Sequence, residues 1–481
     1  MRLVLCLLAV PLLHAQPQAP QPLRYCNPLP LPEYPLQTRG GRDMRSAADP
    51  TVIRVKDKWY MYPSNGMAWW STDMVNWHYQ AMTLPGVRGE TVIWAPTVME
   101  HNGAFYLTAN DIGLYRATDP LGPWQPMGNI VDENGRRFVP FDPMLYRDDD
   151  GRVYLYWSGR EGRGIFGVEL DPANLAKFRG PRTHLFKYEP SHVWERYGDM
   201  NEVSGTTWIE GPWVTKHNGR YYLQYSAPGT EWKTYAVGVY TSDKPLGPYK
   251  YDARSPILVD RKGLLNGSAH HSVVEGPNGT YWVFYHVLYR IRERFERRIA
   301  MDPVGFDAAG NMIMNGPTET PQWAPGVKAR PWESNDTGSM PLTVNKFTFK
   351  ASSSAPGRDP EYAIDNYVRT WWEAAPGDAQ PSLEVDLLQE YTIDSARILW
   401  SDAGLDFERG IKPGPFQYKI EASRNGRDFM TVLDRTQNKE DLNIAFDEIP
   451  PVRARYVRLI VTGGPPRVPI GVVEFTVFGK E

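Results

Sequence analysis

The chain has 481 residues, more than one ordinary domain core holds, so two domains are expected. Aromatic residues make up 13% of it, an excess that favours β-rich structure and surfaces that stack on sugars or bases. The formal net charge of -3 supplies no basic field, so we expect no nucleic-acid partner.

The N-terminus has the pattern of a secretory signal peptide. One Arg precedes a short apolar run, and Ala15 offers a cleavage position, so residues 1–15 are predicted to be removed. The apolar run is too short to span a bilayer, and no later stretch is long enough. Cys6 lies in this segment, which leaves Cys26 without a partner for an internal disulfide. We therefore expect a secreted or periplasmic protein without a membrane span.

Five stretches of the chain repeat one hairpin pattern. Each has a polar or small head residue, an apolar strand, a turn with Asp, Asn or Gly, and a second strand dense in Tyr and Trp. The heads are Asp49, Ala95, Asp142, Glu210 and His270. These heads are 46, 47, 68 and 60 residues apart, a spacing that suits one four-stranded propeller blade each, with some long loops. We predict an all-β protein in which residues 16–320 form a five-bladed β-propeller. A series of β-sandwiches is the alternative, but sandwiches lack this period.

A change of composition follows the repeats. Residues 321–342 are rich in Pro, Gly, Ser and Thr and are predicted to form a linker. Residues 343–481 then contain strands that alternate apolar and polar side chains, as half-buried antiparallel strands do. This pattern predicts a C-terminal β-sandwich.

The heads of the repeats are candidates for chemistry. The innermost strand of each blade lines the channel of a propeller, so equivalent heads converge at one end of it. Asp49, Asp142 and Glu210 would then share one pocket, where proximity separates their pKa values. Glycoside hydrolysis needs such a set, with one protonated acid and one ionised base or nucleophile. Asp-Pro and Glu-Gly-Pro also form turns, so a structural role for each is the alternative.

Four motifs resemble glycoside hydrolase family 43, whose members are five-bladed propeller enzymes. They are Ala48-Asp49-Pro50, Trp94-Ala95-Pro96, Phe141-Asp142-Pro143 and Ile209-Glu210-Gly211-Pro212. The resemblance implies an inverting enzyme. In it, Asp49 would be the general base, Asp142 would orient the acid and tune its pKa, and Glu210 would be the general acid.

The resemblance also suggests substrate and metal contacts. Trp94, Phe141 and Trp208 flank the heads and are candidates for stacking on a sugar, with core packing as the alternative for each. His270 matches a family histidine that lies under the site and binds calcium directly or through water, and His271 is the alternative position. Arg298 resembles a family arginine that reaches the active site, with a solvated surface position as its alternative.

The C-terminal segment resembles discoidin, or coagulation factor 5/8 type C, domains, which include carbohydrate-binding module family 32. The residues that carry this are Ala363-Ile364-Asp365-Asn366, Thr370-Trp371-Trp372 and the closing VVEFTVFG. The resemblance implies a jelly-roll sandwich with a structural calcium near Asp365, Thr370 and Glu474. Hard oxygen ligands of this kind suit calcium. No organic cofactor is expected.

These expectations combine into a secreted glycosidase that acts on plant or microbial polysaccharide. The resemblance implies release of a pentose or furanose, by an α-L-arabinofuranosidase or β-xylosidase type of activity. An exo-β-D-galactofuranosidase of the same family is an alternative, because specificity depends on loops at the pocket rim. A non-catalytic glycan-binding propeller and a family 117 or 32-like propeller enzyme are further alternatives. The sequence leaves the oligomeric state open.

Overall fold

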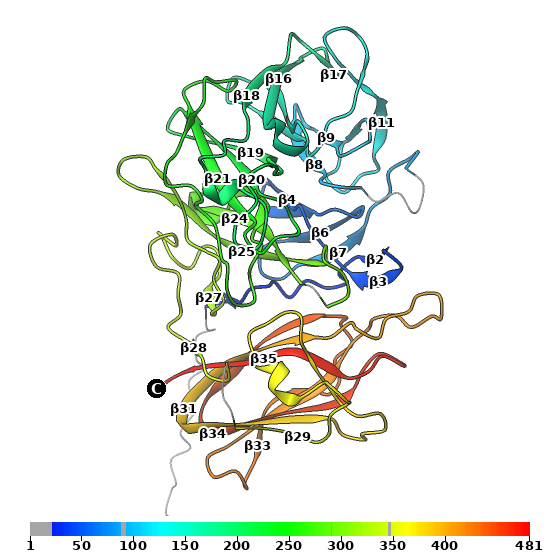
Figure 1. Ribbon diagram of the computed structural model, residues 1–481, viewed down its shortest axis with the longest axis vertical. Helices are drawn as coiled ribbons and strands as arrows, with labels where there is room; N and C mark the ends of the chain where they lie inside the picture. The colour runs from blue at the N-terminus through cyan, green and yellow to red at the C-terminus, as the bar shows by residue number, and fades with distance from the viewer. Residues whose placement is uncertain (1–21, 88–92, 290, 345–347) are drawn as a thin grey trace, which may run out of the picture.

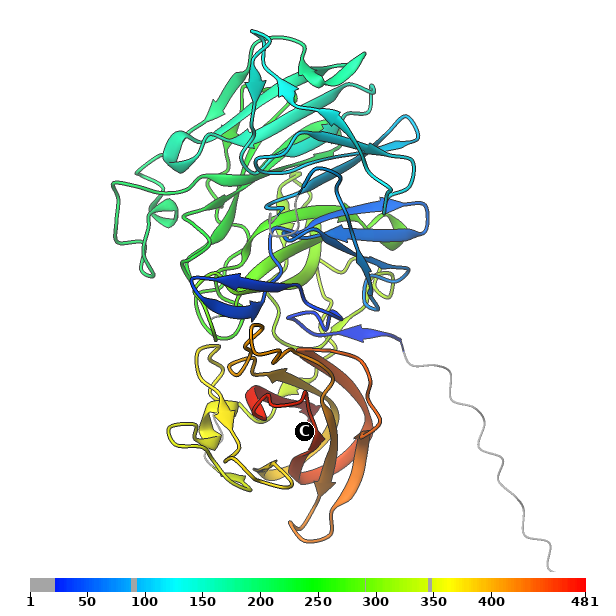
Figure 2. The same ribbon diagram turned by 90° about the vertical axis from the view of Figure 1, so that its right-hand side faces the viewer.

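The computed structural model describes residues 22–87, 93–289, 291–344 and 348–481, which form two β domains stacked along the long axis of the molecule (Figures 1 and 2). The predicted signal peptide, residues 1–15, lies outside the described residues. No helix in the described ranges is long and apolar enough to cross a membrane. The helical segments there are short 3-10 turns, namely η1 (Glu161–Arg163), η2 (Val193–Glu195), η3 (Pro277–Gly279) and η4 (Pro360–Ala363).

Five sheets, built mainly from antiparallel strand pairs, form the blades of the N-terminal domain, as predicted for a propeller. Four of them have four strands each: β4 (Thr51–Val55), β5 (Lys58–Tyr62), β6 (Met67–Ser71) and β7 (His78–Ala81); β8 (Thr97–His101), β9 (Ala104–Thr108), β10 (Leu114–Ala117) and β11 (Gln125–Gly128); β19 (Glu210–His217), β20 (Arg220–Ala227), β21 (Ala236–Ser242) and β22 (Lys250–Tyr251); β23 (Ala269–Glu275), β24 (Tyr281–Leu288), β25 (Arg297–Phe306) and β26 (Met312–Met314).

The third blade in chain order is larger. Its strands are β12 (Ile130–Val131), β13 (Arg137–Phe138), β14 (Met144–Arg147), β15 (Val153–Ser158), β16 (Ile165–Asp171), β17 (Asn174–Phe178) and β18 (Thr183–Phe186). The strands that carry or follow the heads of successive blades contact one another in the order β4, β8, β14, β19, β23, and β23 contacts β4. The ring of five blades is therefore closed.

The second strand of each blade explains the abundance of aromatic residues. All six residues of β15 are buried, because a neighbouring blade covers each face of the sheet. Most buried tyrosine hydroxyls form a hydrogen bond. Tyr62 and Tyr156 each donate to a backbone carbonyl of an inter-strand turn, at Pro120 and Pro245, over 2.6 Å. The aromatic strands therefore fill the space between blades and also tie adjacent blades together.

The C-terminal domain is a β-sandwich, as predicted. Its strands are β28 (Met340–Pro341), β29 (Phe349–Ala351), β30 (Trp372–Glu373), β31 (Ser382–Trp400), β32 (Gln417–Ser423), β33 (Met430–Arg435), β34 (Ile444–Gly463) and β35 (Gly471–Lys480). The long strand β31 pairs with both β34 and β35. The domain has its own core, which includes Trp372, Trp400 and Phe475.

The segment predicted as a linker, residues 321–342, carries short strands at both ends. β27 (Gln322–Trp323) pairs with β1 (Arg24–Tyr25), and β28 pairs with β35 of the sandwich. A hydrophobic cluster also continues from Trp69 and Trp282 of the propeller to Leu399 and Ile444 of the sandwich. The two domains are thus joined by packing as well as by the chain.

Candidate active site

The repeated heads share an unusual backbone conformation. The φ angle is 52° at Asp49, 46° at Ala95, 49° at Asp142, 55° at Gly211 and 42° at His270. Such left-handed values are uncommon outside glycine and often mark functional positions. In the fourth blade, the equivalent residue is Gly211, so Glu210 lies one residue before the position that Asp49 and Asp142 occupy. A Cβ at Gly211 would lie 2.9 Å from His270 Cδ2, which explains the glycine.

A pocket of about 310 Å³ opens over these heads. The structure brings the three predicted carboxyl residues together there, and each is at most 7% exposed. The lining residues are Arg39, Asp49, Trp94, Asn110, Asp111, Phe141, Asp142, Glu210, Thr230, His270, Phe295 and Arg297.

Asp49 lies among positively charged and hydrogen-bonding groups. Its Oδ1 is 3.1 Å from His270 Nδ1 and 3.5 Å from an Arg297 guanidinium nitrogen, and Ser64 Oγ donates to its Oδ2. Burial alone would raise the pKa of Asp49, but His270 and Arg297 lower that pKa well below its usual range. Asp49 is therefore ionised and suited to accept a proton.

Asp142 lies on the other side of His270. Its Oδ2 is 3.9 Å from His270 Nδ1, and Asn110 Nδ2 donates to its Oδ1 over 3.1 Å. Burial and, to a smaller extent, the charge of Asp49 raise the pKa of Asp142, while His270 opposes this rise. His270 thus lies between the two aspartates.

Glu210 has the opposite electrostatic setting to Asp49. Burial, followed by the charge of Asp142, raises the pKa of Glu210 well above its usual range. Tyr235 donates from its hydroxyl to Glu210 Oε1 over 2.7 Å, which leaves Oε2 as the oxygen that carries the proton. Glu210 is therefore suited to donate a proton near neutral pH.

A further set of residues was missed by sequence reasoning and holds the heads in place. Each lies near the end of the second strand of one repeat and accepts a hydrogen bond from the backbone N–H of the next head: Ser64 from Ala95 at 2.9 Å, Asn110 from Asp142 at 2.6 Å, Ser226 from His270 at 2.9 Å, and His286 from Asp49 at 3.3 Å. Burial lowers the pKa of His286 to about 4, so it is neutral and can accept through Nδ1. The common position of Ser, Asn and His at the repeat ends was the available signal.

The predicted aromatic contacts divide into two groups. Trp94 and Phe141 line the pocket. Trp208 does not line it and lies against Phe141, with ring centroids 5.5 Å apart. Trp208 therefore supports the pocket wall.

The prediction that Arg298 reaches the active site is wrong. Its side chain is fully buried between the domains, where it donates to Asn443 Oδ1 over 2.8 Å. Arg297 lines the pocket instead and donates to Thr230 Oγ1 over 3.1 Å. Adjacent residues of a strand point to opposite faces, so a one-residue change in register exchanges their positions.

The structure also separates the two adjacent histidines. His270 is the one that faces the carboxyl groups. His271 is 2% exposed, and neither of its ring nitrogens has a hydrogen-bond partner among the described residues. Burial lowers the pKa of His271 to about 3, so this side chain is neutral.

Residues of the sandwich provide oxygen atoms suited to calcium. Glu474 is fully buried and accepts from the Asn366 N–H at 2.9 Å, while Thr370 donates to Asp365 at 2.7 Å. Within the described chain, Glu474 Oε1 and Asn366 Oδ1 have no hydrogen-bond partner. These side chains fit the donor chemistry of a calcium site. However, no cluster of three or more His, Cys, Asp or Glu side chains in the described ranges is arranged to hold a metal ion.

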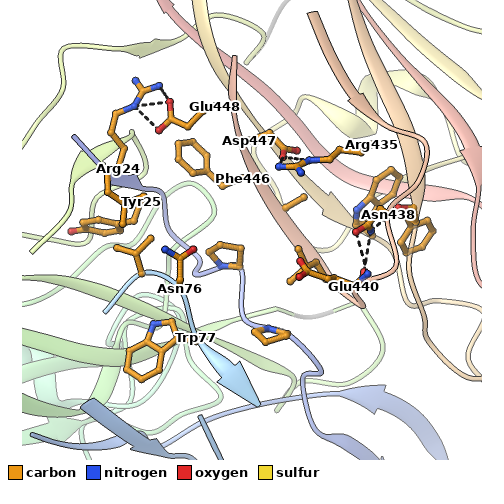
Figure 3. A pocket seen from close by; sticks show the side chains of 18 of the residues that line it. Arg24, Tyr25, Asn76, Trp77, Arg435, Asn438, Glu440, Phe446, Asp447 and Glu448 are labelled. Carbon is orange, nitrogen blue, oxygen red and sulfur yellow. Dashed lines mark hydrogen bonds and ion pairs between the residues drawn. The ribbon is translucent and has the colours of Figure 1, made fainter. Parts of the chain in front are cut away.

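A second cavity, of about 430 Å³, lies between the domains (Figure 3). Four of its charged side chains are paired, Arg24 with Glu448 and Arg435 with Asp447 (Figure 3), and Arg24 also pairs with Asp394. It contains no equivalent of the Asp49–Glu210 combination, so the pocket at the repeat heads is the candidate active site.

A propeller pocket that places a carboxyl group of lowered pKa near one of raised pKa has the pair that glycoside hydrolysis needs. Comparison with known proteins agrees. Residues 44–312 match the family model of glycosyl hydrolases family 43, and residues 348–474 match that of the F5/8 type C domain. The chain belongs to glycosyl hydrolases family 43.

Individual relatives match about half of the chain. The chain is 24% identical over 298 residues to a β-D-galactofuranosidase from Aspergillus niger, which covers 55% of this chain and 81% of that protein. It is 28% identical over 256 residues to a β-xylosidase from Xylanibacter ruminicola, covering 46% and 74%. A crystal structure of a thermostable family-43 glycoside hydrolase matches with a TM-score of 0.52 at 25% identity, covering 63% of this chain and 100% of that one.

Proposed function

We propose that the protein is an inverting glycosidase that releases a pentose or furanose from plant or microbial polysaccharide, of the β-xylosidase or α-L-arabinofuranosidase type. The observation that carries this proposal is the pair formed by Asp49 and Glu210 in one pocket. Their surroundings move their pKa values in opposite directions, which prepares one base and one acid.

The proposed reaction is a single displacement. Asp49 takes a proton from a water molecule as the water attacks the anomeric carbon. Glu210 gives its proton to the glycosidic oxygen as the bond to that carbon breaks. Asp142 keeps the acid protonated through its negative charge, and His270 positions both aspartates. Each acid–base role contributes roughly 10²–10⁴ to the rate.

The pocket supports action on a terminal sugar. Its volume of about 310 Å³ lies at the small end of ligand sites, which span roughly 300–1,000 Å³. Aromatic walls at Trp94, Phe141 and Phe295 can stack on the apolar faces of one or two sugar rings. The Aspergillus niger relative favours an exo-β-D-galactofuranosidase as the second candidate.

The N-terminal pattern supports a further proposal, that the protein is exported and meets its oligo- or polysaccharide substrate outside the cytoplasm. The oxygen atoms of Asp365, Asn366, Thr370 and Glu474 support a structural calcium in the sandwich. Calcium beside His270 remains a prediction.

The test is a screen of nitrophenyl β-xyloside, α-L-arabinofuranoside and β-D-galactofuranoside, followed by proton NMR of the first product formed. We expect one substrate to be hydrolysed, with the anomeric configuration inverted, and Asp49→Asn to abolish the reaction. An initial product of retained configuration would contradict the single displacement. Binding of sugars without hydrolysis of any substrate would favour a glycan-binding propeller.

A further inference from the structure

The side chains of two propeller arginines bind the same carboxylate of the sandwich. Arg45 donates from Nε and Nη2 to the two oxygens of Asp402, at 2.9 and 2.8 Å, and Arg298 Nη2 lies 3.5 Å from Asp402 Oδ2. The side chains of both arginines are fully buried, and that of Asp402 is 2% exposed. Bidentate arginine–carboxylate pairs fix geometry strongly. The three residues therefore form one rigid contact between the domains.

Arg45 begins the segment that ends on the candidate base. Ser46 Oγ accepts from the Arg297 N–H at 3.1 Å and donates to the Phe295 carbonyl at 3.3 Å. The next N–H, of Ala47, donates to the Arg297 carbonyl at 3.1 Å. Asp49 follows only two residues later, so the position of its backbone depends on this short, hydrogen-bonded stretch.

Arg298 fixes the other side of the same contact. Its Nη1 donates to the Arg45 carbonyl over 2.6 Å, and its neighbour Arg297 lies 3.5 Å from Asp49 Oδ1. Since side chains alternate along β25, holding Arg298 toward the sandwich holds Arg297 toward the pocket.

A second tie joins the sandwich to the pocket wall. Arg292 donates to the Leu405 carbonyl of the sandwich and to the Asp43 carbonyl of the β2–β3 hairpin, each over 3.0 Å. This hairpin (β2, Leu36–Arg39; β3, Arg42–Arg45) lies at the domain boundary (Figures 1 and 2). It carries Arg39, whose guanidinium lies 3.8 Å from the centre of the Phe295 ring. Both of these side chains line the pocket.

We infer that Asp402, in the C-terminal sandwich, is a positioning residue for the active site of the propeller. It sets the place of Asp49 through Arg45 and the place of Arg297 through Arg298. The sandwich therefore contributes to catalysis without touching substrate. The kinetic part of this inference rests on the proposed glycosidase function.

The experiment compares the full-length protein with Asp402→Asn, which keeps the side-chain volume and removes the charge. We expect kcat/KM to fall roughly ten- to a hundredfold, as for a misplacement of about 1 Å. We also expect the acidic limb of its pH profile to move to higher pH, because a displaced Arg297 favours the ionised Asp49 less. A purely structural role would leave that limb in place.

The matched control is Asp447→Asn. Asp447 is also buried in the sandwich, but its partners, Tyr418 and Arg435, belong to the same domain. This variant is expected to keep the wild-type kcat/KM and pH profile. Should Asp402→Asn fail to fold, Arg45→Lys removes the bidentate pair while keeping the charge and is expected to show the same changes.

A second measurement does not require activity. Amide hydrogen exchange in residues 36–45 and 291–297 is expected to be faster in Asp402→Asn than in the wild type or in Asp447→Asn. The inference would be overturned if Asp402→Asn had the same amide exchange rates and the same acidic limb of the pH profile as Asp447→Asn. If the wild type hydrolyses none of the glycosides, the proposed function fails, and the exchange data still decide whether Asp402 positions these segments.

Discussion

Glu210 and Asp49 are both buried carboxyl groups, yet their neighbours act on them in opposite ways. Next to Asp49 lie His270 and Arg297, whereas Glu210 is affected by the carboxylate of Asp142. Burial raises the pKa of either carboxyl group, so the local charges decide which one becomes the base. The division of roles therefore follows from neighbours that are distant in the sequence.

Replacement of Asp142 by Asn tests its effect on the acid. Loss of its charge lowers the pKa of Glu210, so the acid loses its proton at a lower pH. The alkaline limb of the kcat profile is expected to move to lower pH, and kcat should fall within the roughly 10²–10⁴ range of an acid–base contribution. The measurement is the pH dependence of kcat.

The control is Asp111→Asn at the same pocket. Asp111 is 73% exposed and pairs only loosely with Arg160, at 3.8 Å. Water screens such a charge, so the limb should stay in place. If the alkaline limb of the kcat profile lay at the same pH in Asp142→Asn and in the wild type, Asp142 would not tune the pKa of Glu210.

Among the individual residues of the site, the sequence predicted those at the heads of the repeats. Asp49, Asp142, Glu210 and His270 stand out because they occupy the same place in similar segments. Arg297 could not be distinguished from Arg298, because the side to which each points depends on the strand register. Tyr235 contacts Glu210 from a position just before β21, outside the repeated pattern, so spacing alone could not reveal it.

At the scale of elements, the left-handed turn at the start of each blade aims the heads into the pocket. Gly211→Ala should disturb it in two ways. An L-residue in this conformation costs about 1–2 kcal/mol. In addition, its Cβ would lie 2.9 Å from His270 Cδ2 and displace the histidine between Asp49 and Asp142. We expect a lower melting temperature and at least a tenfold loss of kcat/KM, on the order of what a small misplacement causes.

Gly219→Ala separates these two causes. Gly219 also has a left-handed backbone, at φ 79°, but no atom lies within 4 Å of a Cβ built there. This variant should lose a similar amount of stability and keep its activity. Equal kcat/KM for Gly211→Ala and wild type would mean that the close approach at His270 has no catalytic role.

The elements themselves were largely predictable. The hairpin repeat has a fixed order of apolar and aromatic strands, which led to the five blades. The composition of residues 321–342 suggested a loose linker, but β27 and β28 pair with strands of both domains. Local composition does not report such pairing, because the partners, β1 and β35, lie near opposite ends of the chain.

At the scale of the whole molecule, the proposed calcium loop also touches the propeller. Asn366 Nδ2 donates to Glu319 Oε2 over 3.2 Å, and Glu319 Oε1 accepts from the Leu264 N–H at 2.7 Å. Removal of calcium with EDTA is expected to lower the melting temperature of the protein, because a ligand that binds only the folded state stabilises it. Added calcium should restore the wild-type value.

Glu474→Gln provides the control for that titration. It removes the buried negative charge from the proposed ligands, so its melting temperature should no longer respond to EDTA. A wild-type melting temperature that does not change with EDTA would rule out a structural calcium in the sandwich.

The arrangement of the two domains could not be predicted from the sequence, because contacts such as Arg45–Asp402 join residues with no shared motif.

The assignment of Glu210 as the acid and Asp49 as the base is tested by measuring kcat for Glu210→Gln and Asp49→Asn on a nitrophenyl glycoside and on an oligosaccharide of the same sugar. A nitrophenolate leaves without a proton, whereas a sugar alcohol needs one. The kcat of Glu210→Gln should therefore fall by a factor of roughly 10²–10⁴ on the oligosaccharide and by much less on the nitrophenyl glycoside. The kcat of Asp49→Asn should fall on both substrates. Equal losses of Glu210→Gln on the two substrates, or no loss, would contradict the assignment.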